Sequence, residues 1–396
     1  MGGFGTRAIR SGLPRDAGTG ALVEPIFLAT TFAQHQVGTP TGSYIYSRSA
    51  NPNRESFEKA IAELESAEYA LAFSSGMAAT AAVFQGLATN SHVVAMGSLY
   101  GGTHRYLMHL APAFGIRVSF VNDIHTELGP LMSESKDKVT VVWIESPSNP
   151  TLSLVDIRAV ADTAHAGGAR IVVDNTFLSP YFQNPLNHGA DLVLHSVTKY
   201  INGHSDVLMG VIASNCLEIK KNLSFIQNAA GSVPGPFDCW LAHRGLKTLH
   251  LRAPAASRSA LAIAEVLAAS PLVLSVNYPG LDDHPDRAIA LKQHRDGLGG
   301  GMVSFRIRGG RDAATKFCEG STLFTLAESL GGLESLCEIP ATMTHAAMPQ
   351  HVREKGGIYD DLIRLSVGVE DTDDLVQDIL KTLEVAAQNS MSGVPE

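Results

Sequence analysis

Short apolar runs alternate with helical patterns over the first half of the chain. The runs are rich in β-branched residues and cover 70–73, 92–96, 139–145, 170–174, 190–195 and 207–212. Between them, segments such as 76–86, 104–114 and 155–165 repeat apolar residues at helical spacing. Strands that alternate with helices in this way predict an α/β fold, in which helices cover a mostly parallel sheet.

The pattern differs on both sides of this region. Residues 1–55 are rich in Gly, Pro, Thr and Ser and show little periodicity, which predicts an N-terminal arm. We assign 56–250 to a large domain and 251–396 to a smaller α+β domain whose strands are more widely spaced. The predicted segments are a helical region at 237–267, strands at 273–278, 302–307 and 362–367, and a last amphipathic helix at 373–386.

Chemistry-bearing residues follow three of the predicted strands. Ligands on parallel sheets lie at the carboxyl ends of the strands, where Ser74-Ser75, Asp174 and Ser196 to Lys199 all fall. A lysine in a partly dry pocket loses its proton easily and can form a Schiff base. The hydroxyls of Ser196 and Thr198 can donate to an anion beside it. By itself, this stretch fits a surface lysine in a hydroxyl-rich turn at least as well as it fits a reactive lysine.

Asp174 and the segment Ser74–Ala79 make the chemical interpretation more specific. Asp174 lies 25 residues before Lys199 and would share its crevice, where a carboxylate can hold a pyridinium N–H (199 − 174 = 25). Asp174 is equally suited to cap a helix, because Asn175-Thr176 follow it. Gly76 opens a small-residue helix whose free N–H groups and positive dipole end suit a phosphate, although no Walker motif is present. The stretch Gly297–Gly301 precedes a strand instead, and we interpret it as a turn.

Composition excludes several classes of function. The formal net charge is −9, which argues against nucleic acid or an anionic membrane as a partner. Apolar runs are too short for a membrane span, and the N-terminus lacks the apolar centre of a signal peptide. Gly2 and Thr6 match the loose N-myristoylation pattern, but no polybasic patch supports it. The four cysteines are far apart, which indicates reduced thiols in a cytoplasmic protein and no metal site.

Taken together, these motifs resemble the pyridoxal-phosphate-dependent enzymes of cysteine and methionine metabolism, the trans-sulfuration family. The resemblance covers nearly the whole chain in order and is greatest toward the eukaryotic cystathionine γ-lyase group. It implies the type I fold of pyridoxal-phosphate enzymes, with a seven-stranded sheet, and a homotetramer built from two catalytic dimers. The segments that carry it are Tyr46–Arg48, Ser75–Thr80, Tyr100–Arg105, Asp174–Thr176, Ser196–Tyr200, Asn202–Asp206, Gly245–His250 and Leu362–Gly368.

The resemblance also implies roles for the residues that would hold the cofactor. Lys199 would bind pyridoxal 5'-phosphate as a Schiff base and then move protons between substrate carbons. Asp174 would pair with the pyridine nitrogen, and Tyr100 would stack on the ring and act as an acid or base. The phosphate would be held by the backbone N–H groups of Gly76 and Met77 and by the hydroxyls of Ser196 and Thr198. Tyr46 and Arg48 would reach the phosphate in the neighbouring subunit.

A second group of residues would bind the substrate. Arg364 would hold the α-carboxylate with help from Asn149, and even without the resemblance a buried arginine in an apolar strand needs an anion. Ser329 would steady the freed amine of Lys199. The remaining members of this group are Glu328, Ile45 and Arg105.

Two of these residues bear on which substrate is used. Relatives that handle cystathionine usually carry an acidic residue just before the Tyr-x-Arg motif, where this chain has Ile45, whereas Glu328 matches their pattern. Ser98, where relatives often have Asp, is a second small departure. We therefore expect a γ-synthase or γ-lyase that acts through a vinylglycine-type ketimine. The leading hypothesis is γ-substitution of an O-activated homoserine, such as O-acetyl-L-homoserine, by a thiol or carbon nucleophile. The alternatives are a cystathionine γ-lyase that forms cysteine, 2-oxobutanoate and ammonia, and a cofactor-bound scaffold without catalysis.

Overall fold

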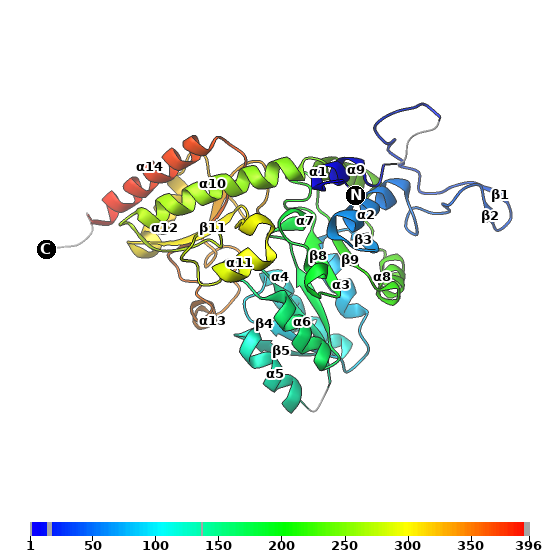
Figure 1. Ribbon diagram of the computed structural model, residues 1–396, viewed down its shortest axis with the longest axis horizontal. Helices are drawn as coiled ribbons and strands as arrows, with labels where there is room; N and C mark the ends of the chain where they lie inside the picture. Colours follow the sequence, from blue (N-terminus) through cyan, green and yellow to red (C-terminus); the bar gives the residue numbers. More distant parts are fainter. Residues whose placement is uncertain (1, 14–17, 136–137, 392–396) are drawn as a thin grey trace.

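A seven-stranded sheet forms the centre of the larger part of the molecule (Figure 1). The computed structural model describes residues 2–13, 18–135 and 138–391, with side chains to 386. The strands lie in the order β3-β9-β8-β7-β6-β4-β5, and β9 alone runs antiparallel to its neighbours. They comprise β3 (Tyr69–Phe73), β4 (His92–Met96), β5 (Arg117–Val121), β6 (Val139–Glu145), β7 (Arg170–Asp174), β8 (Leu192–Ser196) and β9 (Gly210–Ser214). The predicted α/β fold with a mostly parallel sheet is confirmed.

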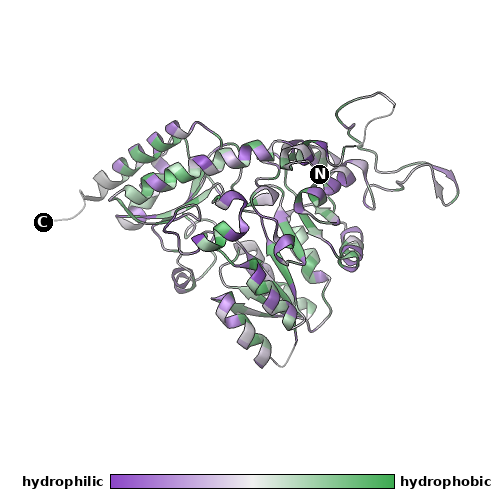
Figure 2. Ribbon diagram, viewed as in Figure 1, coloured by the Kyte–Doolittle hydropathy of each residue, from purple (hydrophilic) through white to green (hydrophobic). Residues whose placement is uncertain are grey.

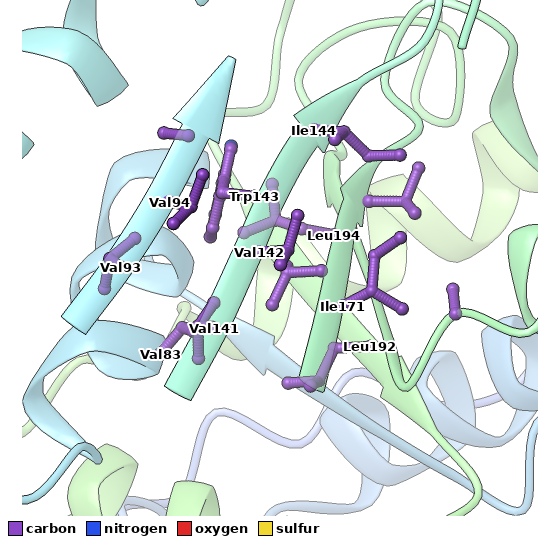
Figure 3. Packing of buried hydrophobic residues seen from close by; sticks show 14 of the residues in the cluster. Val83, Val93, Val94, Val141, Val142, Trp143, Ile144, Ile171, Leu192 and Leu194 are labelled. Carbon is purple, nitrogen blue, oxygen red and sulfur yellow. The ribbon is translucent and has the colours of Figure 1, made fainter. Parts of the chain in front are cut away.

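Helices cover this sheet and supply the polar outer surface (Figure 2). They are α2 (Pro52–Glu65), α3 (Gly76–Gln85), α4 (Gly101–His109), α5 (Ile124–Glu134), α6 (Ile157–Ala166), α7 (Ser179–Phe182), α8 (Leu217–Ala230) and α9 (Pro236–Leu246), with the 3-10 turns η1 (Ala111–Phe114) and η2 (Pro185–His188). Figure 3 shows the core below them, where Val94, Val142, Trp143 and Leu194 project from β4, β6 and β8. Such burial is worth roughly 1.5–3 kcal/mol for each large apolar side chain.

A second, five-stranded sheet is built from the C-terminal part of the chain. Its order is β10-β11-β14-β13-β12, antiparallel except between β12 and β13. The long helix α10 packs against this sheet and against α14. The elements are α10 (Leu249–Ala269), β10 (Val273–Asn277), α11 (Arg287–Gln293), η3 (Arg295–Gly297), β11 (Met302–Ile307), α12 (Gly310–Gly320), β12 (Thr325–Leu326), β13 (Leu336–Glu338), α13 (Gln350–Lys355), β14 (Leu362–Ser366) and α14 (Thr372–Met391).

The N-terminal segment contains more regular structure than its composition predicts. Phe4–Arg10 forms the helix α1, with Phe4 and Ala8 buried one turn apart. Gly5 obscured this pattern, yet it is required because a Cβ there would lie 2.7 Å from the His250 ring. Beyond α1, the segment with β1 (Gln34–Gln36) and β2 (Thr39–Pro40) stands away from the body (Figure 1).

Some predicted boundaries were wrong for local reasons. The helix expected over 104–114 ends at His109, and Pro112 lies in the separate 3-10 turn η1. The strand expected from Val207 starts at Gly210, because the Met209 backbone bonds to Thr198 instead: Met209 N donates to Thr198 Oγ1 at 3.0 Å. The edge strand β5 was not predicted. It mixes Arg117 and Ser119 with apolar residues and pairs only with β4.

Candidate active site

Lys199 lies in a turn directly after β8, with its side chain partly buried. Its Nζ donates a hydrogen bond to Ser329 Oγ at 2.7 Å. Burial disfavours the charged ammonium, and the guanidinium of Arg364 repels it, so the pKa of Lys199 is lowered to about 8. A substantial fraction of the amine is therefore neutral, and nucleophilic, near neutral pH.

Ser329 connects the C-terminal part of the chain to this lysine. Its backbone has a φ of 91°, a left-handed conformation that non-glycine residues rarely adopt. The chain is held there by Gly331, whose N–H donates to Ser366 Oγ at 2.8 Å. Strained backbone of this kind persists only where the surroundings enforce it, and it is concentrated at functional sites.

Two carboxylates lie side by side at the ends of β6 and β7. Glu145 and Asp174 are register partners in the parallel pair, so their side chains point to the same face. Asp174 Oδ1 accepts hydrogen bonds from Thr176 N at 3.0 Å and Thr176 Oγ1 at 2.5 Å. Burial raises the pKa of Asp174. Burial and the neighbouring Asp174 together raise the pKa of Glu145 well above its usual range. A cation beside Asp174, such as a pyridinium N–H, would restore its carboxylate form.

Glu145 also fixes the position of Tyr100. The backbone N–H of Tyr100 lies 2.8 and 3.0 Å from the two carboxyl oxygens of Glu145. Tyr100 is the N-cap residue immediately before α4, and it remains 43% exposed. Glu145 therefore holds the backbone while the phenol ring is free to face the cavity.

The N-terminus of α3, the predicted phosphate site, lies against β8. Ser75 Oγ caps the helix by accepting from Ala78 N at 3.0 Å, and the N–H groups of Gly76 and Met77 have no intrahelical acceptor. A Cβ at Gly76 would lie 3.1 Å from the Cβ of Ser196, so glycine allows a closer approach than a residue with a side chain would. The hydroxyl of Thr198 lies in the next turn, where it bonds to the Met209 backbone.

Arg364 is a buried cation on β14. Its guanidinium donates to Asn149 Oδ1 at 3.0 Å and to the Ser329 carbonyl at 2.8 Å. It also forms an ion pair with Glu338 Oε1 at 3.0 Å, in which both side chains are almost completely buried. Arg364 Nε has no hydrogen-bond partner within the described chain. An unused donor on a buried arginine fits a ligand carboxylate.

A cavity of about 340 Å³ connects these groups. Most of the predicted site residues line it: Gly76, Met77, Tyr100, Asn149, Asp174, Ser196, Thr198, Lys199, Glu328, Ser329 and Arg364. Ser75, noted at its strand end, also lines the cavity. Further lining residues were not predicted as site residues: Thr80, Thr103, Glu145, Pro147, Thr176, Phe177, Leu194, Leu208, Leu330 and Thr344. Glu145 is the last residue of a predicted strand, so the expectation that ligands bind at the carboxyl ends of strands, which singled out Asp174, applies to Glu145 as well.

Four predicted residues lie outside this cavity in their own chain. Ile45 and Tyr46 are 51% and 43% exposed on the arm, and Arg48 donates to the Asn228 carbonyl at 2.9 Å. Arg105 lies on the exposed side of α4. The roles of these four residues remain predictions. No group of His, Cys, Asp and Glu in the described part of the chain could hold a metal ion, and no described helix is long and apolar enough to span a membrane.

Comparison with known proteins gives matches over almost the entire chain. The family model of the Cys/Met metabolism PLP-dependent enzymes matches residues 5–384. Cystathionine gamma-lyase of Saccharomyces cerevisiae is 56% identical over 388 residues, which cover 97% of this chain and 98% of the relative. The crystal structure of cystathionine gamma-lyase from yeast superposes with a TM-score of 0.93, covering 97% of this chain and 98% of that one. Cystathionine gamma synthase from Xanthomonas oryzae pv. oryzae is 41% identical with a TM-score of 0.94, covering 98% and 99% of the two chains.

The residues present fit pyridoxal phosphate, group by group. The amine of Lys199 suits its aldehyde, the carboxylate of Asp174 suits its pyridine nitrogen, and the cradle at Gly76 suits its phosphate. These groups line one cavity. The chain belongs to the family of Cys/Met metabolism PLP-dependent enzymes and uses pyridoxal phosphate as its cofactor.

Proposed function

We propose that this chain is a cystathionine γ-lyase, which cleaves the Cγ–S bond of cystathionine and releases cysteine, 2-oxobutanoate and ammonia. The observation that carries the proposal is that Glu328 lines the same cavity as Arg364 and Lys199. Cystathionine carries an amino group and a carboxylate at each end, so a cation suits the carboxylate at the reacting end and an anion suits the distal ammonium group. Cystathionine gamma-lyases at 46–56% identity, from yeast to human, support this choice over the homoserine ester.

Different residues of the chain would bind the substrate and transfer protons. When bound, the cofactor supplies an electron sink that acidifies the C–H bonds next to the substrate nitrogen. Arg364 and Asn149 would hold the α-carboxylate, while Lys199, steadied by Ser329, would carry protons between carbon atoms.

The remaining residues would hold the cofactor. Asp174 would keep the pyridine nitrogen protonated, and Tyr100 would lie against the ring. The phosphate would be bound by Gly76, Met77, Ser196 and Thr198.

The arm would complete the site of a second subunit. Tyr46 and Arg48 are exposed, and they follow the segment with β1 and β2, which stands away from the body of its own chain (Figure 1). We propose that they bind the cofactor phosphate across a subunit interface in a cytoplasmic homotetramer of two catalytic dimers. In this proposal, 1–55 is the exchanged arm, 56–250 the cofactor domain and 251–396 the C-terminal domain.

A substrate panel tests the proposed reaction. Purified holoenzyme is given cystathionine, O-acetyl-L-homoserine alone, and O-acetyl-L-homoserine with a thiol, and both keto acid and amino acid products are measured. We expect kcat/KM to be highest for cystathionine, with 2-oxobutanoate and cysteine formed in equal amounts. A higher value for O-acetyl-L-homoserine, with a thioether product, would contradict the proposal.

One observation favours γ-replacement on O-acetyl-L-homoserine as a second candidate. Ile45 immediately precedes Tyr46, so it would reach the distal end of the neighbouring site together with it, and it offers no charge to an ammonium group. Loss of such a partner costs on the order of 1–3 kcal/mol of binding. The same panel distinguishes the two candidates, because only replacement consumes the thiol.

A further inference from the structure

Arg54 is a buried arginine that lies outside the cavity and holds three consecutive backbone carbonyls of the arm. It is the third residue of α2 and is only 3% exposed. Its Nη1 donates to Ser47 O at 3.0 Å, and its Nη2 donates to Arg48 O at 3.3 Å and Ser49 O at 2.8 Å. One rigid guanidinium therefore fixes the backbone immediately after Tyr46.

The guanidinium is itself anchored in the body of the chain. Arg54 Nε lies 3.7 Å from Glu58 Oε1 across one turn of α2, and the same oxygen accepts from Ala72 N at 2.8 Å. Ala72 lies on β3 of the central sheet. A continuous series of contacts thus runs from the sheet through Glu58 and Arg54 to the segment 47–49.

Two neighbouring residues at the start of α2 hold Pro25 and Phe27, an earlier part of the N-terminal segment, and one of them also holds Ser47. Asn51, which is 2% exposed, donates to Phe27 O at 3.0 Å and to Ser47 Oγ at 3.1 Å. Asn53, fully buried, donates to Pro25 O at 2.8 Å. Three buried polar side chains in four residues would be costly for a segment with no task beyond beginning a helix.

We propose that Arg54 is a positioning residue that sets Tyr46 and Arg48 in place for the cofactor phosphate of the neighbouring subunit. The inference rests on the proposed function, in which the arm acts across the interface. Arg54 touches neither cofactor nor substrate, so its effect would be to keep the binding-competent arm conformation populated. If that conformation falls to about a tenth of the population, cofactor binding weakens about tenfold.

Hybrid dimers test this proposal, because a defect in the arm acts on the other subunit. Arg54→Met is co-expressed with Lys199→Ala under two affinity tags, and the hybrid is isolated. In the hybrid, the intact Lys199 site receives the intact arm of the Lys199→Ala subunit. We expect cofactor affinity to be about tenfold weaker in the Arg54→Met homo-oligomer and to return to the wild-type value at the Lys199 site of the hybrid. Affinity is measured by absorbance titration of the apoprotein, with γ-elimination activity as a second readout.

Arg252→Met provides a matched control that acts within its own subunit. Arg252 is also buried and donates to three backbone carbonyls, those of Tyr200 at 2.7 Å, Ile201 at 3.2 Å and Gly245 at 2.9 Å. Two of these residues follow Lys199, so the damage stays in the Lys199-bearing subunit. The Arg252→Met and Lys199→Ala hybrid should therefore remain impaired. An Arg54 hybrid that is equally impaired, or an Arg54→Met homo-oligomer with wild-type affinity, overturns the inference.

Arg48→Ala in the same hybrid separates this inference from the proposed function. Recovery in the Arg48→Ala hybrid without recovery in the Arg54→Met hybrid would reject the role of Arg54 alone. Failure of both hybrids to recover would reject an arm that acts across the interface, and the role of Arg54 with it. Arg54→Lys, which keeps the charge but loses the fork that spans three carbonyls, should give an intermediate affinity.

Discussion

Glu338→Gln is the substitution that should separate the structural role of the buried ion pair from its effect on Lys199. Glu338 and Arg364 are register partners on β13 and β14, and both side chains are almost inaccessible. Glu338 Oε1 also accepts from Thr344 Oγ1 at 2.7 Å. The amide of glutamine preserves the shape of the side chain and removes the charge.

The magnitude follows from the geometry of the pair. At 3.0 Å the Coulomb attraction is about 5.5 kcal/mol at an effective dielectric constant of about 20. The desolvation of two buried charges offsets most of this attraction, so the intact pair contributes little net stability. Removing one partner leaves the charge of Arg364 uncompensated, so we expect the free energy of unfolding to fall by about 3–5 kcal/mol.

The second effect concerns the pKa of Lys199. The carboxylate of Glu338 raises this pKa and the guanidinium of Arg364 lowers it. Glu338→Gln should therefore move the pKa of Lys199 below about 8, whereas Arg364→Leu should move it upward. The two substitutions break the same pair but shift the lysine in opposite directions, which a general disturbance of folding would not do.

Two assays check these expectations. Denaturant unfolding of the apoprotein gives the stability change, and the rate of covalent capture of pyridoxal phosphate as a function of pH gives the pKa of Lys199. Glu328→Gln is the control, because Glu328 is exposed in the same cavity and its loss should change stability by less than about 0.5 kcal/mol. Unchanged stability in Glu338→Gln, or a capture midpoint that moves upward, would refute the reasoning.

Three further predictions follow from the site. In the wild-type apoprotein, the rate of covalent cofactor capture, followed by stopped-flow absorbance, should rise with pH with a midpoint near pH 8, because only the neutral amine of Lys199 attacks the aldehyde. A midpoint near 10.5 would show that burial does not lower the pKa of Lys199. Glu145→Gln should retain near-normal cofactor affinity, because burial raises the pKa of Glu145 and so disfavours its charge, and an amide oxygen can still accept from Tyr100 N. Glu145→Ala should lose about 1–3 kcal/mol of unfolding free energy in urea. Ile45→Glu should raise kcat/KM for cystathionine about tenfold relative to kcat/KM for O-acetyl-L-homoserine, and Ile45→Gln is the uncharged control. An equal change of this ratio in both variants would exclude a charge effect.

Much of the cofactor site could be predicted from the sequence because its residues lie at strand ends. Lys199, Asp174 and Gly76 each follow a strand that a run of apolar residues marks, and parallel strands bring their carboxyl ends to one edge. Arg364 was recognisable because a cation within an apolar strand requires an anion. Local pattern and the general geometry of the sheet bring these residues together, and the family resemblance assigns their roles.

The partners of these residues could not be predicted in the same way. Glu338 lies on a three-residue strand that is too short to show periodicity, and it meets Arg364 only through the antiparallel pairing of β13 and β14. The bond from Lys199 to Ser329, expected only from the resemblance, spans 130 residues and depends on the left-handed backbone at Ser329. In the sequence, Arg54 is one member of a polar cluster, and nothing there indicates that it binds three backbone carbonyls. Long-range pairing and backbone conformation decide each of these contacts.

The proposed arrangement assigns reaction type and substrate choice to different parts of the molecule. Lys199, Asp174 and Arg364 are held by strands, strand ends and buried partners of one chain, so small changes there would affect every substrate alike. Ile45 stands on an exposed segment whose backbone is bonded to the body mainly through α2. A side chain on that segment can change without disturbing a buried charge or a proton path. Substrate preference is therefore free to shift at Ile45 while elimination chemistry stays fixed at Lys199. On this view, an apolar residue at 45 would alter which distal group of the substrate is bound, while Lys199 would move the protons in elimination and replacement alike.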